Sequence, residues 1–261
     1  MLTRSKVILD EAAAAKAAVR RVAGGEAGTV RLGITPPAAP VLAPHLINLF
    51  AAEAPQAAVK LQRMWLPELL GAVVTGDIDV ALTCGLVPEP AGVATEVFCA
   101  EPLLVGLRPD HRLASRDTIA LSELGREVLG TAPEALFPAW ALAQRQALDA
   151  ARVAPPTTEL ADTDLAANRW ADQHDIDWIL LIPSLAVAHT QTVIRPVAPR
   201  QLVPFTLQWN PTRAHTMAVA RFVHCVLAAD LPPGWHTQPD HLHHSEQAED
   251  RDDPYPSQQH D

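Results

Sequence analysis

The sequence predicts an α/β protein of two small lobes, because strand and helix patterns alternate in two separate blocks. Residues 29–85 read as strand, helix, strand, helix, strand, and residues 127–182 repeat that alternation. Strands that alternate with helices of this length form parallel sheets joined by right-handed crossovers. Two such blocks in series predict two Rossmann-like lobes with a central cleft between them.

The first block opens with a short apolar strand over residues 29–34. Thr35 is then a predicted helix N-cap, and Pro36 and Pro37 suit the first turn of a helix that ends near Glu53. The block continues with a strand over 59–65, a helix that Gly76 stops, and a buried strand over 78–83.

Two strands, over 93–99 and 103–107, lead into the second block. That block comprises strands over 127–131, 157–160 and 177–182 and helices over 138–152 and 162–173. Strands over 193–197 and 204–209 and a helix over 213–229 complete the pattern. We expect lobe I to hold residues 29–101 and 206–231, and lobe II to hold residues 102–205.

The two ends of the chain differ from this body. Residues 3–22 read as one long helix, so residues 1–28 are a predicted linker helix, which Gly24 and Gly25 end. Residues 232–261 are a predicted disordered tail, acidic and rich in histidine. Residues 236–261 hold seven acidic residues against Arg251, a charge of −6, which leaves −4 of the formal −10 for the rest. This balance argues against nucleic-acid binding by the chain itself.

Cysteine usage and hydropathy predict a cytoplasmic protein. The three cysteines, Cys84, Cys99 and Cys225, are far apart and odd in number, which excludes a disulfide framework and indicates a reducing compartment. No basic segment followed by an apolar one opens the chain, and no apolar run is long enough to span a membrane.

Several segments resemble the effector-binding half of LysR-type transcriptional regulators, over roughly residues 3–230. The most specific are the strand entry Gly76-Asp-Ile-Asp-Val-Ala-Leu82 and the turn Asp110-His-Arg-Leu-Ala114. The resemblance implies a periplasmic-binding-protein type II-like fold, a homodimer or tetramer, and a small metabolite bound between the lobes. It also implies that DNA contact needs the family's winged helix-turn-helix, which is absent from this chain: residue 1 falls about where that domain would end.

Ligands of open parallel sheets lie beyond the carboxyl ends of the strands, and this rule selects the candidate effector site. The selected residues are Thr35, Pro36, Met64, Trp65, Thr83, Cys84, Thr131 and Pro133. The Thr35 hydroxyl could donate to an anionic effector, or serve only as an N-cap. Trp65 and Met64 could form a wall for a ring, or only pack the lobes.

Three further side chains each have a functional and a structural interpretation. Arg63 could neutralise an effector acid, or be an ordinary surface arginine. Cys84 could be a redox sensor, which needs an exposed thiol of low pKa, or a small packing residue. Thr131 mirrors Thr35 in lobe II.

The predicted function is effector binding by a regulator of the LysR type, for a small carboxylate with an aromatic ring as one option. The alternatives are a partner that lacks DNA binding and pairs with a full-length regulator, and a solute-binding protein that is not exported. No catalytic or phosphate-loop motif is present, so we expect neither an enzyme nor a cofactor. The histidines of the tail (His236, His241, His243 and His244) favour a solvated segment over a metal site.

Overall fold

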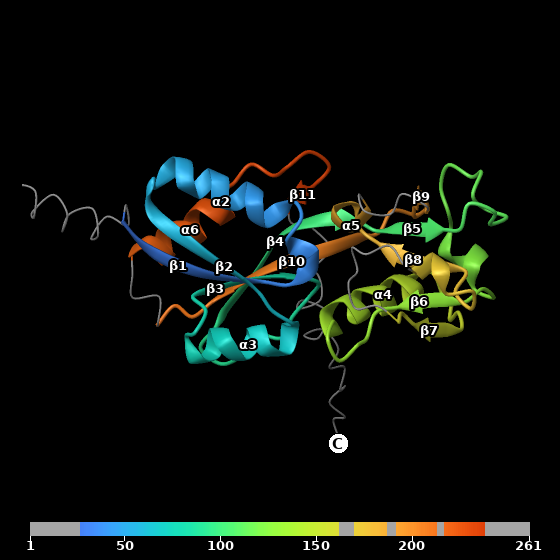
Figure 1. Ribbon diagram of the computed structural model, residues 1–261, viewed down its shortest axis with the longest axis horizontal. Helices are drawn as coiled ribbons and strands as arrows, with labels where there is room; N and C mark the ends of the chain where they lie inside the picture. Colours follow the sequence, from blue (N-terminus) through green and yellow to red (C-terminus); the bar gives the residue numbers. More distant parts are fainter. Residues whose placement is uncertain (1–26, 162–169, 187–191, 213–216, 238–261) are drawn as a thin grey trace, which may run out of the picture.

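A computed structural model of the chain describes residues 27–161, 170–186, 192–212 and 217–237 (Figure 1). The predicted linker helix, up to residue 26, and residues 238–261 of the predicted tail lie outside the described residues. The strands form two sheets, one of six strands in the order β11-β4-β10-β3-β1-β2 and one of five in the order β7-β6-β8-β5-β9. Figure 1 shows the two sheets as separate lobes that lie end to end along the long axis.

The six-stranded sheet of lobe I combines parallel and antiparallel strands. Its strands are β1 (Ala27–Ile34), β2 (Gln56–Arg63), β3 (Val80–Cys84), β4 (Ala94–Pro102), β10 (Leu202–Trp209) and β11 (His236–Thr237). β1 pairs in parallel with β2 and β3, which confirms the predicted parallel arrangement of these strands. β10 runs antiparallel between β3 and β4.

Helices cover both faces of this sheet. Figure 1 shows α2 (Leu42–Glu53) and α6 (Met217–Leu227) on one face and α3 (Leu66–Thr75) on the other. Phe50 of α2 meets Phe222 of α6 edge to face, with ring centroids 5.1 Å apart. Asp79, just before β3, accepts hydrogen bonds from the Arg31 backbone N–H (2.8 Å) and guanidinium, which fixes β1 against β3. The first predicted helix differs in its start: a 3₁₀ turn, η1 (Pro36–Ala38), precedes α2.

Lobe II is a smaller mixed sheet. It contains β5 (Leu104–Leu107), β6 (Leu129–Thr131), β7 (Thr157–Glu159), β8 (Trp178–Leu181) and β9 (Val193–Pro196), with α4 (Pro138–Ala150), α5 (Pro183–Ala186) and the 3₁₀ turns η2 (Leu121–Leu124) and η3 (Trp170–Asp172). β6 pairs in parallel with β7 and β8, whereas β5 runs antiparallel to β8 and β9. Of the helix predicted over 162–173, residues 162–169 lie outside the described residues, and η3 occupies most of the remainder.

Two chain segments cross between the lobes side by side. β4 leads into β5 through Leu103, and β9 returns to β10 through residues 197–201. The Leu103 N–H donates to the Gln201 carbonyl at 2.9 Å, and the Leu103 carbonyl accepts from the Val197 N–H at 3.4 Å. The two crossings therefore form one hydrogen-bonded ribbon.

The first residues of the predicted tail lie against lobe I. Trp235 is buried and its ring lies 4.7 Å from that of Phe205, while β11 pairs with β4. An aromatic side chain that finds an apolar neighbour can order a segment whose overall composition is polar. Among the described helices, none is long and apolar enough to cross a membrane.

Candidate functional site

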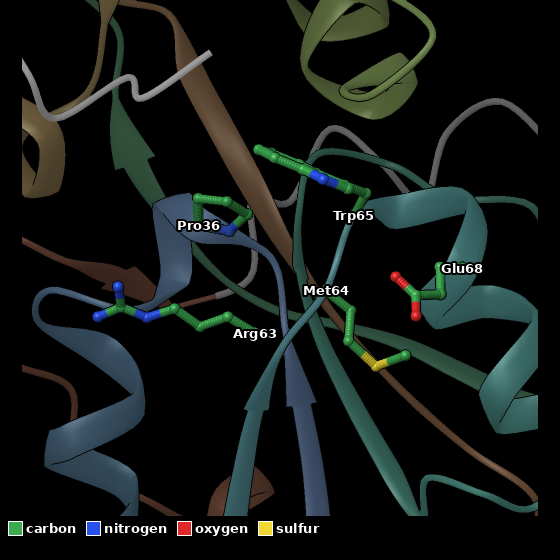
Figure 2. A pocket seen from close by; sticks show the side chains of 5 residues that line it. All are labelled: Pro36, Arg63, Met64, Trp65 and Glu68. Carbon is green, nitrogen blue, oxygen red and sulfur yellow. The ribbon is translucent and has the colours of Figure 1, made fainter.

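A cavity of about 290 Å³, here called the cleft pocket, lies on lobe I and is lined by Pro36, Arg63, Met64, Trp65 and Glu68. Its residues come from η1, the end of β2 and the start of α3, so they collect at the carboxyl edge of the parallel strands. Figure 2 shows the Trp65 indole extending towards Pro36, with Met64 below it. Arg63 and Glu68 extend to opposite sides. Three of the residues that were selected because they lie at strand ends, Pro36, Met64 and Trp65, therefore line the same pocket.

The cleft pocket carries two charges that no neighbour neutralises. Arg63 and Glu68 are exposed, and among the described residues neither side chain has a hydrogen bond or ion pair. Glu68 lies in the first turn of α3, where backbone N–H groups and the helix dipole favour negative charge. Arg63 is the group that can receive an anion here.

Thr35 follows β1 and precedes Pro36, and its hydroxyl connects the end of β1 to β3. The Thr35 Oγ1 accepts from the Cys84 N–H at 3.2 Å, and the side chain makes no capping bond to η1. The prediction that the Thr35 side chain caps its own helix is therefore wrong, because its hydroxyl instead accepts a hydrogen bond from Cys84 of β3. Only 4% of Thr35 is exposed, and the residue does not line the cleft pocket.

Thr83 and Cys84 are buried in β3. The Thr83 hydroxyl donates to the Thr206 carbonyl at 3.3 Å. Burial, with a smaller effect from the nearby Glu101 carboxylate, raises the pKa of the Cys84 thiol well above its usual value. A buried thiol of raised pKa is unreactive, which favours the packing interpretation of Cys84.

The lobes touch beside the cleft pocket. The Trp65 ring meets Phe137, at the start of α4, edge to face with centroids 5.0 Å apart. Gly85 has φ +96°, and a Cβ there would lie 2.6 Å from the Ala139 carbonyl oxygen of α4. Glycine therefore permits both the turn after β3 and the close approach of lobe II.

A buried carboxylate also joins the lobes. Glu101, at the end of β4, accepts hydrogen bonds through Oε1 from the Ser184 N–H (3.2 Å) and Oγ (2.9 Å) of α5. Its Oε2 is buried and has no hydrogen-bond partner among the described residues. Burial raises the pKa of Glu101 to about 7, although the Ser184 hydrogen bonds partly oppose this shift.

The predicted lobe II residues lie elsewhere. Thr131 lines a second cavity, of about 320 Å³, which Met64 and Trp65 do not reach. Pro133 lines neither of these two cavities, and its carbonyl accepts from the Leu136 and Phe137 N–H groups before α4. The structure therefore divides the predicted residues among the cleft pocket, buried positions at strand ends, a separate pocket and, for Pro133, the turn before α4.

Three contributors were not predicted from the sequence. Glu68 lies three residues after the predicted strand end, in the first turn of the next helix, where a carboxylate is favoured. This position could have identified Glu68 as a candidate from the sequence. Phe137 and Ser184 lie far along the chain from Trp65 and Glu101, and no local pattern connects these pairs. Within the described ranges, no cluster of three or more metal-ligating side chains is found.

Comparison with known proteins agrees with this architecture. The model of the LysR substrate binding domain family matches residues 23–230. Among curated proteins, the uncharacterized HTH-type transcriptional regulator YybE of Bacillus subtilis is 29% identical over 126 residues, which are 48% of this chain and 43% of the relative. The dual regulator OxyR of Escherichia coli is 22% identical over 129 residues, 49% of this chain and 42% of OxyR. The matches therefore span less than half the length of these relatives.

Solved structures share the fold. The LysR family regulator CbnR superposes with a TM-score of 0.74 at 20% identity, over 86% of this chain and 78% of CbnR. The effector binding domain of QuiR, in complex with shikimate, superposes with a TM-score of 0.67 at 14% identity, over 77% of this chain and 96% of that domain. The two mixed α/β sheets are those of type II periplasmic-binding-protein-like effector domains, and the chain belongs to the LysR substrate-binding domain family.

Proposed function

We propose that this chain is the regulatory part of a transcription regulator and binds a small carboxylate effector between its lobes. The observation that carries this proposal is the cleft pocket, in which Arg63 is an unpaired cation beside the apolar Met64 and Trp65. An arginine at the rim can pair with a carboxylate, while the indole and thioether cover an apolar body or ring. That QuiR was solved with shikimate, a ring carboxylate, supports the same ligand class.

The contacts between the lobes suggest how the ligand acts. Trp65 belongs to the cleft pocket and also touches Phe137 of lobe II. A ligand that binds one lobe arrangement better than another shifts the equilibrium between the two. Effector binding at Trp65 then changes the angle between the lobes.

The remaining parts of the proposal follow family membership. The regulator works in the cytoplasm as a homodimer or tetramer, and it reaches DNA through a winged helix-turn-helix. The predicted lobe boundary at residue 206 divides β10, which pairs within the sheet of lobe I, so we assign residues 29–101 and 202–231 to lobe I and residues 102–201 to lobe II. An enzymatic role receives no support, since the relatives are transcriptional regulators.

A thermal-shift screen tests the ligand class. Benzoate, shikimate and short aliphatic carboxylates are compared with their neutral amides, and we expect only acids to raise the melting temperature. Arg63→Gln should weaken the best acid about fivefold or more, whereas Glu68→Gln should strengthen it, because these substitutions remove an attractive and a repulsive charge respectively. Equal binding of acid and amide, or no response to Arg63→Gln, would contradict the proposal.

A further inference from the structure

The second cavity, here called the side pocket, lies in lobe II between α4 and the edge of the sheet. Leu129 and Thr131 of β6 stand opposite Thr157 and Glu159 of β7, and alternate residues of a strand share one face. The helix contributes Ala141, Gln144, Arg145 and Leu148, whose spacing places them on one face of α4. The side pocket of about 320 Å³ is therefore a gap between one helix face and one sheet face, beside the edge strand β7.

Gln144 is the most buried polar side chain that lines the side pocket, and its amide remains accessible at the cavity wall. It is 5% exposed, lines the cavity, and has no side-chain hydrogen bond to any described residue. An amide that is accessible at a cavity wall and has no protein partner offers a ligand both a donor and an acceptor. A ligand in the side pocket can therefore form a hydrogen bond with the Gln144 side chain.

The charges around the side pocket favour a cation. Arg145 is already paired with Glu134, with Nη1 and Oε1 2.8 Å apart. Glu159 lines the same cavity, and its carboxylate has no partner among the described residues. An anion would meet an unpaired carboxylate and an arginine that is already engaged, whereas a cation would meet a free acceptor.

The remaining walls favour an aliphatic body. Leu129, Ala132, Ala141 and Leu148 supply the apolar lining. The volume is at the small end for ligand cavities. We propose that the side pocket binds a small primary alkylammonium compound, whose ammonium donates to the Glu159 carboxylate and the Gln144 amide oxygen while its chain lies against Leu129 and Leu148. This site is separate from the proposed effector site in the cleft.

The experiment uses the full chain and n-butylammonium as the probe, followed by ¹H–¹⁵N NMR. 1-Butanol and butyrate carry the same alkyl body without the cation and are titrated in parallel. We expect saturable binding of the amine in the millimolar range, because so small a ligand makes few contacts. Its shifts should centre on residues 129–131, 141–148 and 157–159.

Substitutions then test the two polar contacts. Glu159→Gln should weaken amine binding about tenfold, since it removes a charge-assisted hydrogen bond. Asp149→Asn, on the exposed surface of α4, removes the same charge outside the pocket and should leave binding unchanged. Gln144→Leu should weaken binding about fivefold, and Glu159→Gln decides the question alone if that variant does not fold.

Each other outcome overturns the assignment. Equal binding of butanol or butyrate would reject a cation site, and shifts confined to residues 63–68 would place the amine in the cleft pocket. Absence of saturable binding, or an equal loss in Asp149→Asn and Glu159→Gln, would reject the side pocket as a specific site. None of these results depends on whether the cleft binds a carboxylate.

Discussion

Glu101 shows how one buried side chain can make stability depend on pH. Its carboxylate links β4 of lobe I to α5 of lobe II, and one oxygen is buried without a described partner. Burial raises the pKa of Glu101 from 4.5 to about 7, so the folded protein holds this proton more tightly than the unfolded chain does. The stabilisation from the proton is complete below pH 4.5 and is lost as the pH rises through about 7.

Replacing Glu101 by glutamine should therefore flatten the pH dependence. Between pH 5 and pH 8 we expect the native chain to lose about 3 kcal/mol of unfolding free energy relative to Glu101→Gln, measured by urea titration. Glu96→Gln, an exposed carboxylate on the same strand, is the control and should follow the native profile. Parallel profiles for the native chain and Glu101→Gln would show that Glu101 does not carry this proton.

Gly85 gives a second prediction at the residue scale. Gly85→Ala should destabilise the protein by about 2 kcal/mol or more, because the new methyl group would meet the Ala139 backbone and φ is positive. Gly92 also has positive φ, but nothing lies within 4 Å of its added Cβ. Gly92→Ala should therefore cost less, and equal losses in thermal unfolding would mean that lobe contact is not the cause.

At the scale of elements, Asp79 positions two neighbouring strands. It accepts from the backbone and side chain of Arg31, which fixes the start of β3 beside β1. Asp79→Ala should cost about 2 kcal/mol in urea unfolding, since it removes charge-assisted bonds to a part-buried partner. Asp77→Ala, two residues away and exposed, should cost about 0.5 kcal/mol. A reversed order of the two losses would assign the anchor to Asp77.

The sequence predicted the elements better than their assembly. Periodicity located β1, β2 and β3 and their parallel pairing, because apolar strands and amphipathic helices leave local patterns. It did not predict that β10 inserts antiparallel between β3 and β4, since that pairing joins segments about a hundred residues apart. The sequence also did not predict the 3₁₀ turn at Pro36, because two consecutive prolines suit either the first turn of an α-helix or a 3₁₀ turn.

The candidate site was predictable only where it is local. Pro36, Met64 and Trp65 follow strand ends and converge on one pocket, as the rule for parallel sheets requires. Thr131 is also at a strand end, as the last residue of β6, yet it lines the side pocket together with residues of α4. Which strand ends of two lobes face each other depends on how the lobes are rotated, and no short-range sequence pattern encodes that rotation.

Over the whole molecule, the burial of the three cysteines predicts that their thiols react only slowly with peroxide. All three thiols are buried, and burial raises the pKa of Cys84, Cys99 and Cys225, the last to about 11. Since the thiolate is the reactive form, iodoacetamide should label the native chain at least about tenfold more slowly than the chain in urea. Hydrogen peroxide at concentrations that oxidise free cysteine should leave all three thiols reduced by mass spectrometry. Rapid oxidation of any of them would instead favour a redox-sensing role.

The ribbon at the crossing limits how the lobes can move. Because Leu103 bonds to both Gln201 and Val197, the two crossing segments bend together, and twisting one against the other would break those bonds. The lobes are thus left with essentially one soft degree of freedom, a flexing about the ribbon. A single distance across the cleft, such as one between spectroscopic labels near Trp65 and Phe137, would then follow the entire motion.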